Sequence, residues 1–316
     1  MKIVVTGALG HIGSYLIRDL AARFPGAEIL LLDNLLTQRY SALFNLPPTG
    51  RYRFHEIDVA KADMRPYLEG AYAVIHLAAI TDAAGSFDRA EELEANNFQS
   101  TQKVAEACSQ TGARLLALSS TSVYGTAKDV VSEDSGPEDL QPQSPYATTK
   151  LKEERLLQSW GGSTDLRFVS CRFGTIFGAS PGMRFHTAVN KFCWQAVMGV
   201  SLTVWSTAYD QKRPYLDLVD AARAVALILR EDLFDRRVYN VVTINATVRQ
   251  VVEALRRFVP DLDVTLVDNR IMNQLSYEVS CERFAGVGFH PCGDLARGIG
   301  ETVALLRTAN SSRPYC

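Results

Sequence analysis

The sequence lacks an apolar stretch long enough to cross a membrane: no hydrophobic run approaches the roughly 20 residues that a spanning helix needs. It also lacks an excess of either charge, because 33 Lys and Arg stand against 35 Asp and Glu, for a formal net charge of −2. No global positive field points to nucleic acid or an anionic membrane as a partner. The opening MKIVVTGALG predicts a strand rather than a signal peptide, because its apolar run is short and ends in glycines.

Cysteine is scarce and scattered. The six cysteines form no C-x-x-C pair and no cluster with histidine, which argues against a disulfide framework and against a zinc site. This pattern predicts reduced thiols in a cytoplasmic protein. The five histidines form no H-E-x-x-H pattern, so no metal is expected. Internal repeats and low-complexity segments are also missing.

What the sequence has is a regular alternation of apolar runs and amphipathic segments. Its 316 residues, 47% of them apolar, suffice for one large domain or two closely joined ones. The alternation predicts an α/β fold, a Rossmann-type doubly wound parallel sheet. Strands are expected at residues 2–6, 28–32, 53–57, 73–79, 114–119 and 166–172, helices at 90–108 and 146–160, and a polar loop at 129–143.

The pattern changes after Phe173, where a smaller C-terminal α/β substrate-binding lobe is expected. We assign residues 1–176 and about 215–245 to the Rossmann domain, and 177–214 and 246–316 to the lobe. The predicted elements of this half are a loop at 173–182, helices at 183–200, 219–230 and from Thr247 to about 258, and strands at 201–204, 238–242 and 264–267, of which 238–242 is expected to rejoin the main sheet.

Three glycines follow the first predicted strand. Gly7, Gly10 and Gly13 are spaced G-x-x-G-x-x-G, and a helical pattern begins directly after them. A strand, a glycine turn and a helix bring backbone N–H groups up to a pyrophosphate, and glycine leaves no Cβ in the way. The alternative is a strand–helix turn without a ligand.

Acidic residues end the second and third predicted strands. Asp33 follows Gly13 by 20 residues, where a carboxylate binds a ribose 2′-OH and repels a 2′-phosphate, so NAD is favoured over NADP. Arg39 lies nearby and keeps NADP open, and Asp33 could instead be a helix cap. Asp58 could meet an adenine amino group or cap the next helix. His76 is interpreted as a core histidine rather than a base.

Tyr146 and Lys150 form the most informative pair. They are four residues apart in a predicted helix, so their side chains share one face. An ammonium beside a phenol stabilises the phenolate, which makes the phenol a proton-transfer group. Ser120 follows the strand predicted at 114–119, at the end where ligands bind in open α/β sheets, and its hydroxyl could orient a substrate oxygen.

In these motifs the chain resembles the extended short-chain dehydrogenase/reductases, specifically the nucleotide-sugar epimerase/dehydratase family typified by UDP-glucose 4-epimerase. The resemblance covers essentially the whole chain. The matching motifs are Thr6-Gly7-x-x-Gly10-x-x-Gly13, Asp33, Asp58-Val59, His76-Leu77-Ala78-Ala79, Asn96-Asn97, residues 119–125, Tyr146-x-x-x-Lys150, Arg172-Phe173-Gly174 and residues 213–220.

The resemblance implies a role for each matching residue. Tyr146 is the catalytic base, Lys150 binds the nicotinamide ribose, Ser120 bonds the reacting sugar oxygen, and Arg213 grips the substrate diphosphate unless it forms only a surface ion pair. The residues implied for NAD are Gly7, Gly10, His11, Ile12, Gly13, Asp33, Asn34, Asp58, Val59, Leu77, Ala78, Ala79, Asn97, Tyr146 and Lys150. Those implied for the substrate are Ser120, Thr121, Ser122, Tyr146, Thr175, His186, Asn190 and Arg213.

Two departures from the family pattern bear on the reaction. The 4,6-dehydratases carry Thr-Asp-Glu before Val-Tyr-Gly, whereas this chain has Ser120-Thr121-Ser122, which leaves elimination of water without an acid and a carboxylate. UDP-glucose epimerase has Asn where this chain has Thr175. His186 and Asn190 could line the substrate pocket or could fix the loop that carries them.

The resemblance thus implies an NAD-dependent epimerase of a nucleotide-diphosphate sugar, most simply a 4-epimerase with tightly bound NAD and a 4-keto intermediate. The alternatives are an NAD(P)-dependent sugar or alcohol dehydrogenase or ketoreductase, an atypical dehydratase, and a non-catalytic nucleotide sensor. Sensors usually lose the Tyr or the Lys, and both are present here. A homodimer through the helices at 90–108 and 146–160 is also expected.

Overall fold

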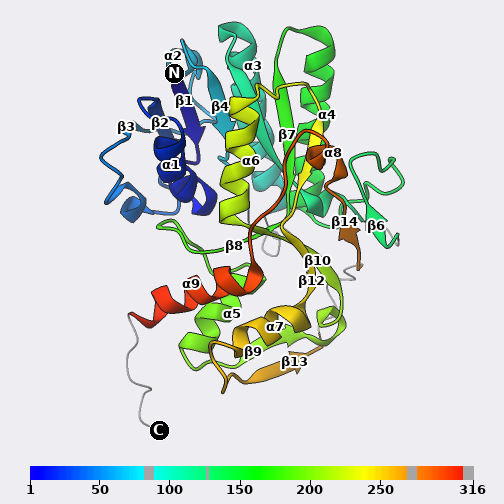
Figure 1. The fold of residues 1–316 in the computed structure, drawn as a ribbon. Coiled ribbons are helices and arrows are strands. Elements are labelled where there is room, and N and C mark those ends of the chain that lie inside the picture. Colours follow the sequence, from blue (N-terminus) through cyan, green and yellow to red (C-terminus); the bar gives the residue numbers. More distant parts are fainter. Residues whose placement is uncertain (82–88, 126–127, 269–275, 309–316) are drawn as a thin grey trace.

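A seven-stranded sheet forms the larger part of the computed structural model, which describes residues 1–81, 89–125, 128–268 and 276–308 (Figure 1). Its order is β11-β7-β5-β4-β1-β2-β3, and all neighbouring pairs are parallel. The strands are β1 (Lys2–Thr6), β2 (Glu28–Asp33), β3 (Arg51–Glu56), β4 (Ala73–His76), β5 (Arg114–Ser120), β7 (Phe168–Phe173) and β11 (Val238–Val241). The predicted Rossmann-type sheet is confirmed, and its strand order reverses between β1 and β4.

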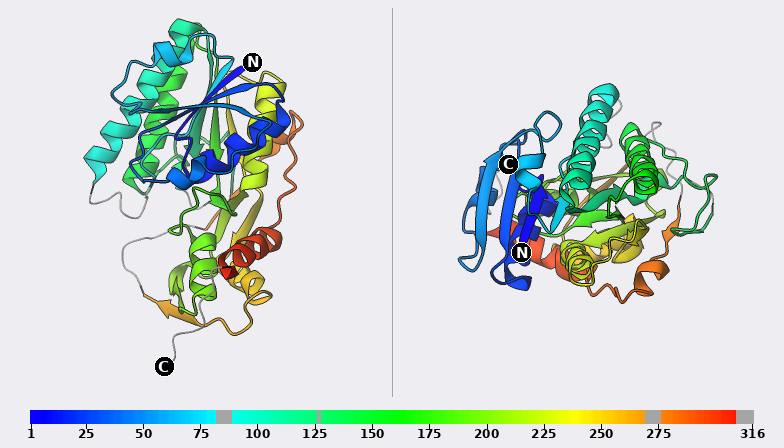
Figure 2. Two further views of the ribbon diagram at one scale, coloured as in Figure 1. Left: turned by 90° about the vertical axis from the view of Figure 1, so that its left-hand side faces the viewer. Right: turned by 90° about the horizontal axis from the view of Figure 1, so that it is seen from above.

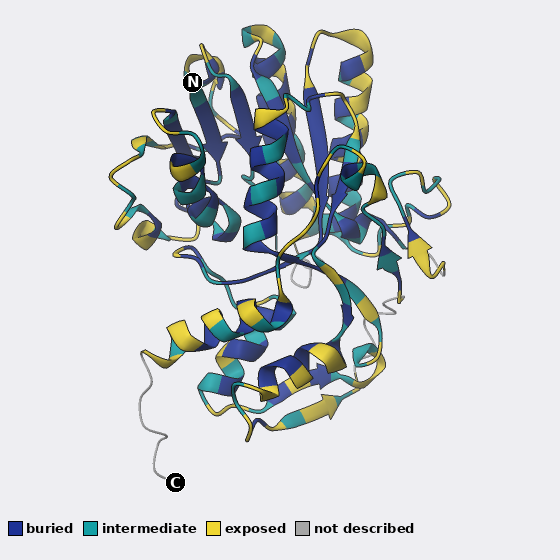
Figure 3. Cartoon of the chain, in the orientation of Figure 1, coloured by how far each residue is buried: buried dark blue, intermediate teal, exposed yellow. Residues whose placement is uncertain are grey.

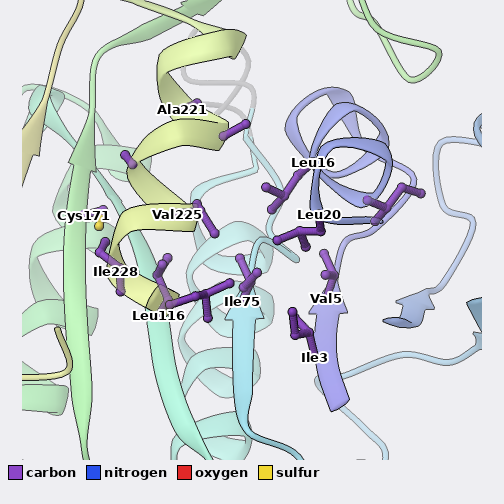
Figure 4. Packing of buried hydrophobic residues seen from close by; sticks show 14 of the residues in the cluster. Ile3, Val5, Leu16, Leu20, Ile75, Leu116, Cys171, Ala221, Val225 and Ile228 are labelled. Carbon is purple, nitrogen blue, oxygen red and sulfur yellow. The ribbon is translucent and has the colours of Figure 1, made fainter. Parts of the chain in front are cut away.

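Helices cover both faces of this sheet (Figure 2). In β1, Ile3 and Val5 face α1 (His11–Arg23) and α6 (Leu218–Arg230), while Val4 belongs to the core on the side of α3 (Ala90–Thr111) and α4 (Pro145–Ser163). Figure 4 shows the first of these cores, where Leu16 and Leu20 meet the strands. Because both faces are buried, the central strands are largely apolar runs, and Figure 3 colours them as buried, whereas the edge strand β3 is mostly exposed.

The smaller part is a lobe below the sheet in Figure 1. A three-stranded sheet, β12-β10-β8, joins it to the larger part, and its helices pack on one another around a separate apolar core. Its elements are β8 (Thr175–Phe177), α5 (Ala188–Val197), β9 (Leu202–Trp205), β10 (Lys212–Asp217), β12 (Ile244–Thr247), α7 (Val248–Arg256), β13 (Val264–Val267) and α9 (Leu295–Arg307). As predicted, Thr247 caps α7, where its side chain accepts from the Gln250 N–H in a capping box.

Several predicted elements differ from the observed ones. The loop at 173–182 contains β8, because its backbone pairs with β10. The helix expected at 183–200 begins only at Ala188, after a turn, and α4 runs through Gly161 and Gly162 to Ser163. β4 ends at His76, so residues 77–79 lie beyond the strand. The short elements are α2 (Arg65–Leu68), η1 (Tyr40–Leu43), η2 (Thr121–Val123), η3 (Ser206–Ala208), β6 (Val130–Val131), β14 (Glu278–Val279) and α8 (Glu282–Ala285).

One segment returns from the lobe to the large sheet. β14 pairs with β6 inside the loop predicted at 129–143, and α8 packs on β11 through Phe284, whose ring lies 4.9 Å from that of Tyr239. Residues 278–285 therefore lie against the larger part, although their sequence position suggested the lobe. The division of function between the two ranges stays a prediction.

Two observations concern the absences noted in the sequence. No helix among the described residues is long and apolar enough to span a bilayer. Five cysteines, Cys108, Cys171, Cys193, Cys281 and Cys292, are free thiols, and Cys316 lies outside the described residues.

A buried ion pair ties α4 to the sheet. Arg172 of β7 donates to both carboxylate oxygens of Glu154, at 2.9 and 2.6 Å, and also to the Tyr124 hydroxyl at 2.8 Å. Ser119 donates to the same carboxylate at 2.5 Å. Neither charged side chain is more than 6% exposed, so each depends on the other for compensation.

We predict that Arg172→Met lowers the free energy of unfolding by about 3–5 kcal/mol, because it leaves Glu154 buried without its counter-charge. Arg249→Met is the matched control. It breaks an exposed pair with Asp210 and should cost at most about 1 kcal/mol. Urea unfolding of the two variants tests this, and equal losses would contradict it.

Candidate active site

A cavity of about 940 Å³ lies where the large sheet meets the lobe. Its walls come from the residues that follow β1, β2, β3, β4 and β5 and from the lobe segments around residues 173–187 and 213–214. This is the carboxyl edge of the sheet at the point where strand order reverses, the position at which doubly wound proteins bind ligands.

The glycine turn forms one wall of this cavity. Gly7 has φ +62°, and a Cβ on it would lie 2.7 Å from the Ala78 backbone nitrogen. A Cβ on Gly13 would lie 2.4 Å from the Gly7 carbonyl oxygen. Gly10, His11, Ile12 and Gly13 all line the cavity where α1 begins, so the N–H groups of the first turn face it. The turn therefore fits the pyrophosphate of a dinucleotide.

Asp33 holds the glycine turn from the second strand. Its carboxylate accepts from the Leu9 N–H at 3.0 Å and from the Leu35 N–H at 2.9 Å, and no helix begins at this point. Asn34 also lines the cavity, and Arg39 lines the same end, where burial lowers its pKa.

Asp58 and Val59 line the cavity after β3. The Asp58 carboxylate accepts from the Ala60 N–H at 3.0 Å and pairs with Lys61 at 3.0 Å, so it does cap a turn. Contact between Asp58 and adenine stays a prediction.

Two polar residues that the sequence placed near the cofactor, His76 and Asn97, are buried and do not line the cavity. His76 is buried between the hydroxyls of Thr6, at 2.8 Å, and Thr101, at 3.3 Å, and burial lowers its pKa to about 3. It is a core histidine, as interpreted. Asn97 does not line the cavity either: its side chain bonds the backbone N–H and carbonyl of Ile80, at 2.7 and 2.9 Å. Ile80, Leu77, Ala78 and Ala79 do line the cavity.

Tyr146 stands on the first turn of α4, whose N-cap is Ser144. It lines the cavity, while Lys150 lies buried behind it, with its ammonium 5.9 Å from the phenol ring centroid. Ser120 ends β5 across the cavity and accepts hydrogen bonds from the Ser122 N–H at 3.2 Å and the Ser122 hydroxyl at 2.8 Å. With Ser120 accepting twice, its own O–H is available to donate to a ligand.

The residues implied for the substrate separate into two groups. Thr121, Ser122, Thr175, His186 and Arg213 line the cavity with Ser120 and Tyr146.

Asn190 does not line the cavity. Asn190 is fully buried, accepts from the Gly178 N–H at 3.2 Å and donates to the Arg184 carbonyl at 3.3 Å. Of the two possibilities left open for it, Asn190 fixes the loop.

The segment 178–184, here called the strap, crosses the glycine turn. The Gly178 carbonyl lies 2.9 Å from the His11 ring, and the Gly182 N–H donates to the Ser14 hydroxyl at 2.8 Å. Gly182 is so close that a Cβ on it would lie 2.2 Å from the Leu9 carbonyl oxygen. Buried beneath the strap, His11 has its pKa lowered to about 4 by desolvation.

Sequence reasoning missed several lining residues, among them Arg184, Thr81 and Tyr277. Arg184, at the end of the strap, lines the cavity and donates to the hydroxyl of Thr81, which also lines it. Tyr277 enters from the segment that returns to the large sheet, and its hydroxyl donates to the Thr121 carbonyl at 3.2 Å. The Arg213 guanidinium lies 5.7 Å from the Tyr277 ring. No motif marks Tyr277, and Arg184 stood in a stretch predicted to be helical.

A search of the described ranges finds no group of three or more His, Cys, Asp or Glu side chains that could hold a metal ion. The polar side chains that line the cavity carry phenols, hydroxyls, guanidinium groups, imidazole and the carboxylates of Asp33 and Asp58.

The chain is similar to known proteins over most of its length. The family model described as "NAD dependent epimerase/dehydratase family" matches residues 3–241. The trifunctional UDP-glucose 4,6-dehydratase/UDP-4-keto-6-deoxy-D-glucose 3,5-epimerase/UDP-4-keto-L-rhamnose-reductase RHM1 of Arabidopsis thaliana is 29% identical over 96% of this chain and 46% of its own length. The chain thus spans about half the length of RHM1 and its relatives RHM2 and RHM3. The uncharacterized UDP-glucose epimerase YtcB of Bacillus subtilis (strain 168) is 31% identical over 72% of each chain.

Solved structures of similar proteins carry a dinucleotide. MoeE5 in complex with UDP-glucuronic acid and NAD is 28% identical, with a TM-score of 0.84 over 98% of this chain and 100% of that one. The UDP-glucose 4-epimerase of Thermus thermophilus in complex with NAD is 26% identical, with a TM-score of 0.80 over 98% and 100% of the two chains.

We predict opposite effects for two glycine-to-alanine changes. Gly182→Ala forces a methyl group into the Leu9 and Gly10 backbone and should destabilise the protein by about 1–3 kcal/mol. Gly162→Ala, in α4 with no atom within 4 Å of the new Cβ, should stabilise it by up to about 1 kcal/mol. Urea unfolding measures both. A neutral Gly182→Ala would show that the strap does not press on the turn.

Proposed function

The chain belongs to the NAD-dependent epimerase/dehydratase family, and on this premise we propose that it is a nucleotide-sugar 4-epimerase that keeps its NAD bound. One observation carries the proposal. A phenol in the cavity, Tyr146, stands one helical turn from a buried ammonium, and hydroxyls rather than carboxylates surround it.

The residues around the glycine turn suit NAD. Backbone N–H groups at His11 to Gly13 would hold the pyrophosphate, since the Gly10 N–H already donates to the Gly7 carbonyl, and Asp33 would accept from the adenosine ribose. Its negative charge favours NAD over NADP, although Arg39 lies at the same end. When bound, NAD supplies an acceptor for hydride from C4 of the sugar and returns that hydride to the opposite face.

The side chains of the chain itself handle the proton. Tyr146, with Lys150 behind it, would accept the proton of the sugar 4-hydroxyl as the bond to carbon becomes a carbonyl. The O–H of Ser120 would donate to that oxygen and keep it facing the phenol. After the 4-keto sugar has rotated in the cavity to present its opposite face, Tyr146 would return the proton.

The charge distribution favours epimerisation over elimination. Among the described lining residues, the carboxylates are Asp33 and Asp58, both at the end assigned to adenosine. Thr121 and Ser122 face the cavity where a dehydratase needs an acid and a carboxylate. An atypical elimination with Tyr146 as the base is the remaining route to a dehydratase.

The strap favours retention of the cofactor, which an epimerase needs and an ordinary dehydrogenase does not. It bonds both His11 and Ser14 at the start of α1, and it ends in Arg184, which reaches Thr81 on the other side of the cavity. A dinucleotide on the glycine turn would leave only when this segment lifts. A non-catalytic sensor would have no use for the intact Tyr146 and Lys150.

A nucleotide-diphosphate sugar suits the rest of the cavity. Arg213, held against the Tyr277 ring, would pair with the diphosphate, and Thr175 and His186 would contact the sugar. MoeE5 was solved with UDP-glucuronic acid and with UDP-glucose, which supports a UDP-hexose or a uronate as the first substrate to try. A homodimer through α3 and α4, which pack side by side, and a cytoplasmic location remain predictions.

Tyr146→Phe should lower the rate of sugar interconversion by about 10²- to 10⁴-fold, because it removes the proton-transfer group, while the bound NAD content stays unchanged. Tyr209→Phe, on the lobe, is the matched control and should keep full activity. The assay follows epimer pairs of UDP-, dTDP-, GDP- and CDP-hexoses and of UDP-glucuronate. No interconversion of any pair would reject the epimerase, and stoichiometric NADH formation would favour the dehydrogenase.

Arg184→Ala should release the cofactor, since it removes the link from the strap to Thr81. We expect wild-type protein to retain NAD through gel filtration and the variant to lose most of it, with a dissociation rate at least about tenfold higher, equivalent to about 1.4 kcal/mol. Arg249→Ala, on the lobe surface, is the control. Equal retention in both variants would remove the role given to the strap.

A further inference from the structure

A second buried ion pair lies directly behind the phenol. The Lys150 ammonium is 2.9 Å from the Glu153 carboxylate, one turn further along α4, and the two side chains are 5% and 6% exposed. Neither residue lines the cavity. The proposed reaction uses Lys150 but gives no task to Glu153.

Glu153 is the carboxylate that balances Lys150. The titratable groups that face the ammonium are Tyr146, Glu153 and Glu154 of α4 and His76 of β4. Glu154 is held by Arg172, and burial keeps His76 neutral.

Burial alone would lower the pKa of Lys150, yet this pKa is raised, because the attraction of Glu153, supported by Tyr146 and Glu154, more than offsets desolvation. The ammonium thus stays charged, but it acts on its surroundings as half of an ion pair.

The pair is not arranged for stability alone. The second oxygen of Glu153, Oε1, is buried and makes no standard hydrogen bond within the described part of the chain, although the Thr101 side chain faces the carboxylate. A buried carboxylate with an unsatisfied oxygen costs folding free energy. An apolar side chain at position 153 would avoid that cost but would leave the buried Lys150 ammonium without a counter-charge, so the role of Glu153 lies in its effect on Lys150.

We propose that Glu153 is a positioning residue that directs the Lys150 ammonium and cancels most of its charge, and so sets the pH range in which Tyr146 gives up its proton. The inference rests on the proposed function in taking Tyr146 as the base. Its physical basis is additive charge. The Glu153 carboxylate lies 2.9 Å from the Lys150 ammonium, which lies 5.9 Å from the centre of the Tyr146 ring. Over such distances, in a buried region with an effective dielectric constant of about 20, a unit charge shifts a titration by about one pH unit or more.

The sign of the effect follows from counting protons. The Tyr146 phenol, the Lys150 ammonium and the negative Glu153 carboxylate form one assembly of neighbouring groups, in which each charge acts on the others. Removing that negative charge makes the assembly one unit more positive, so the first proton leaves at lower pH whichever group releases it. With Glu153 neutralised and Lys150 keeping its proton, the phenolate should therefore form at lower pH, and the acid limb of the rate profile should move with it.

The test is a titration of the NAD-bound protein. The phenolate of Tyr146 is followed by its ultraviolet difference spectrum, with Tyr146→Phe in each background as the reference. Glu153→Gln should move the phenolate titration and the acid limb of the kcat profile to lower pH by about one unit or more. Glu94→Gln is the control, because it breaks the surface pair with Lys152 between α3 and α4, and it should move neither.

A second variant keeps the proposal testable if Glu153→Gln does not fold. Lys150→Met/Glu153→Gln removes both charges and leaves no unpaired ion. If Glu153 cancels Lys150 in the wild type, the phenolate in this double variant should form within about half a pH unit of the wild-type value. If the pH midpoint of the phenolate titration rises by a unit or more in the double variant, Lys150 acts as an uncompensated cation and the proposal is overturned. An unchanged midpoint in Glu153→Gln would overturn it as well.

The titration needs no sugar, so it separates two failures. If the phenolate shifts as expected but no nucleotide sugar is interconverted, the proposed function falls and the role of Glu153 stands. If sugars are interconverted and Glu153→Gln changes neither titration nor rate profile, the epimerase stands and this inference falls.

Discussion

The backbone at Gly7 and Gly13 has no room for another side-chain atom, and the rest of the site depends on this close packing. The Ala78 backbone approaches Gly7 from β4, while Gly182 approaches Gly10 from the lobe. Asp33 holds the same turn from β2 through the Leu9 N–H. Three segments distant in sequence therefore meet at one turn, and a ligand on that turn contacts all of them at once.

Helix α4 brings charge into the interior and pairs it there. Its buried face carries Lys150, Glu153 and Glu154, which would be costly if left unpaired. Glu154 is neutralised by Arg172 from β7, which anchors the helix to the sheet. Lys150 is neutralised from its own helix by Glu153. The Arg172–Glu154 pair thus anchors the helix to the sheet, and the Lys150–Glu153 pair behind Tyr146 balances the charge within the helix.

The cavity combines two environments suited to the two halves of the proposed reaction. At the sheet, glycines and Asp33 offer backbone N–H groups and one carboxylate to a dinucleotide. At the lobe, hydroxyls and the guanidinium groups of Arg184 and Arg213 face the space beside Tyr146. Relatives of the chain include both epimerases and dehydratases, so the fold alone does not choose between them. The proposal of an epimerase rests instead on a local feature, the hydroxyls of Thr121 and Ser122.

The sequence by itself determined what depends on local periodicity. Apolar runs separated by amphipathic segments located the strands of the large sheet to within two residues at most ends. The four-residue spacing put Tyr146 and Lys150 on one face of α4. The glycine spacing and Asp33 were recognisable because a pyrophosphate site needs them at set positions after a strand. The exceptions include the start of α5 and the short strand β8, which owes its form to pairing with the distant β10.

Only the tertiary structure decided which polar residues face the cavity. Asn97 and Asn190 turned away to hold backbone at Ile80 and Gly178, whereas Arg184 and Tyr277 turned in. Asn97 and Asn190 bond backbone only 17 and 12 residues away, whereas the inward positions of Arg184 and Tyr277 depend on contacts with Thr81 and Thr121, 103 and 156 residues away. No local pattern encodes such contacts, because the cost of closing a long loop is met by packing over the whole fold rather than by any single motif.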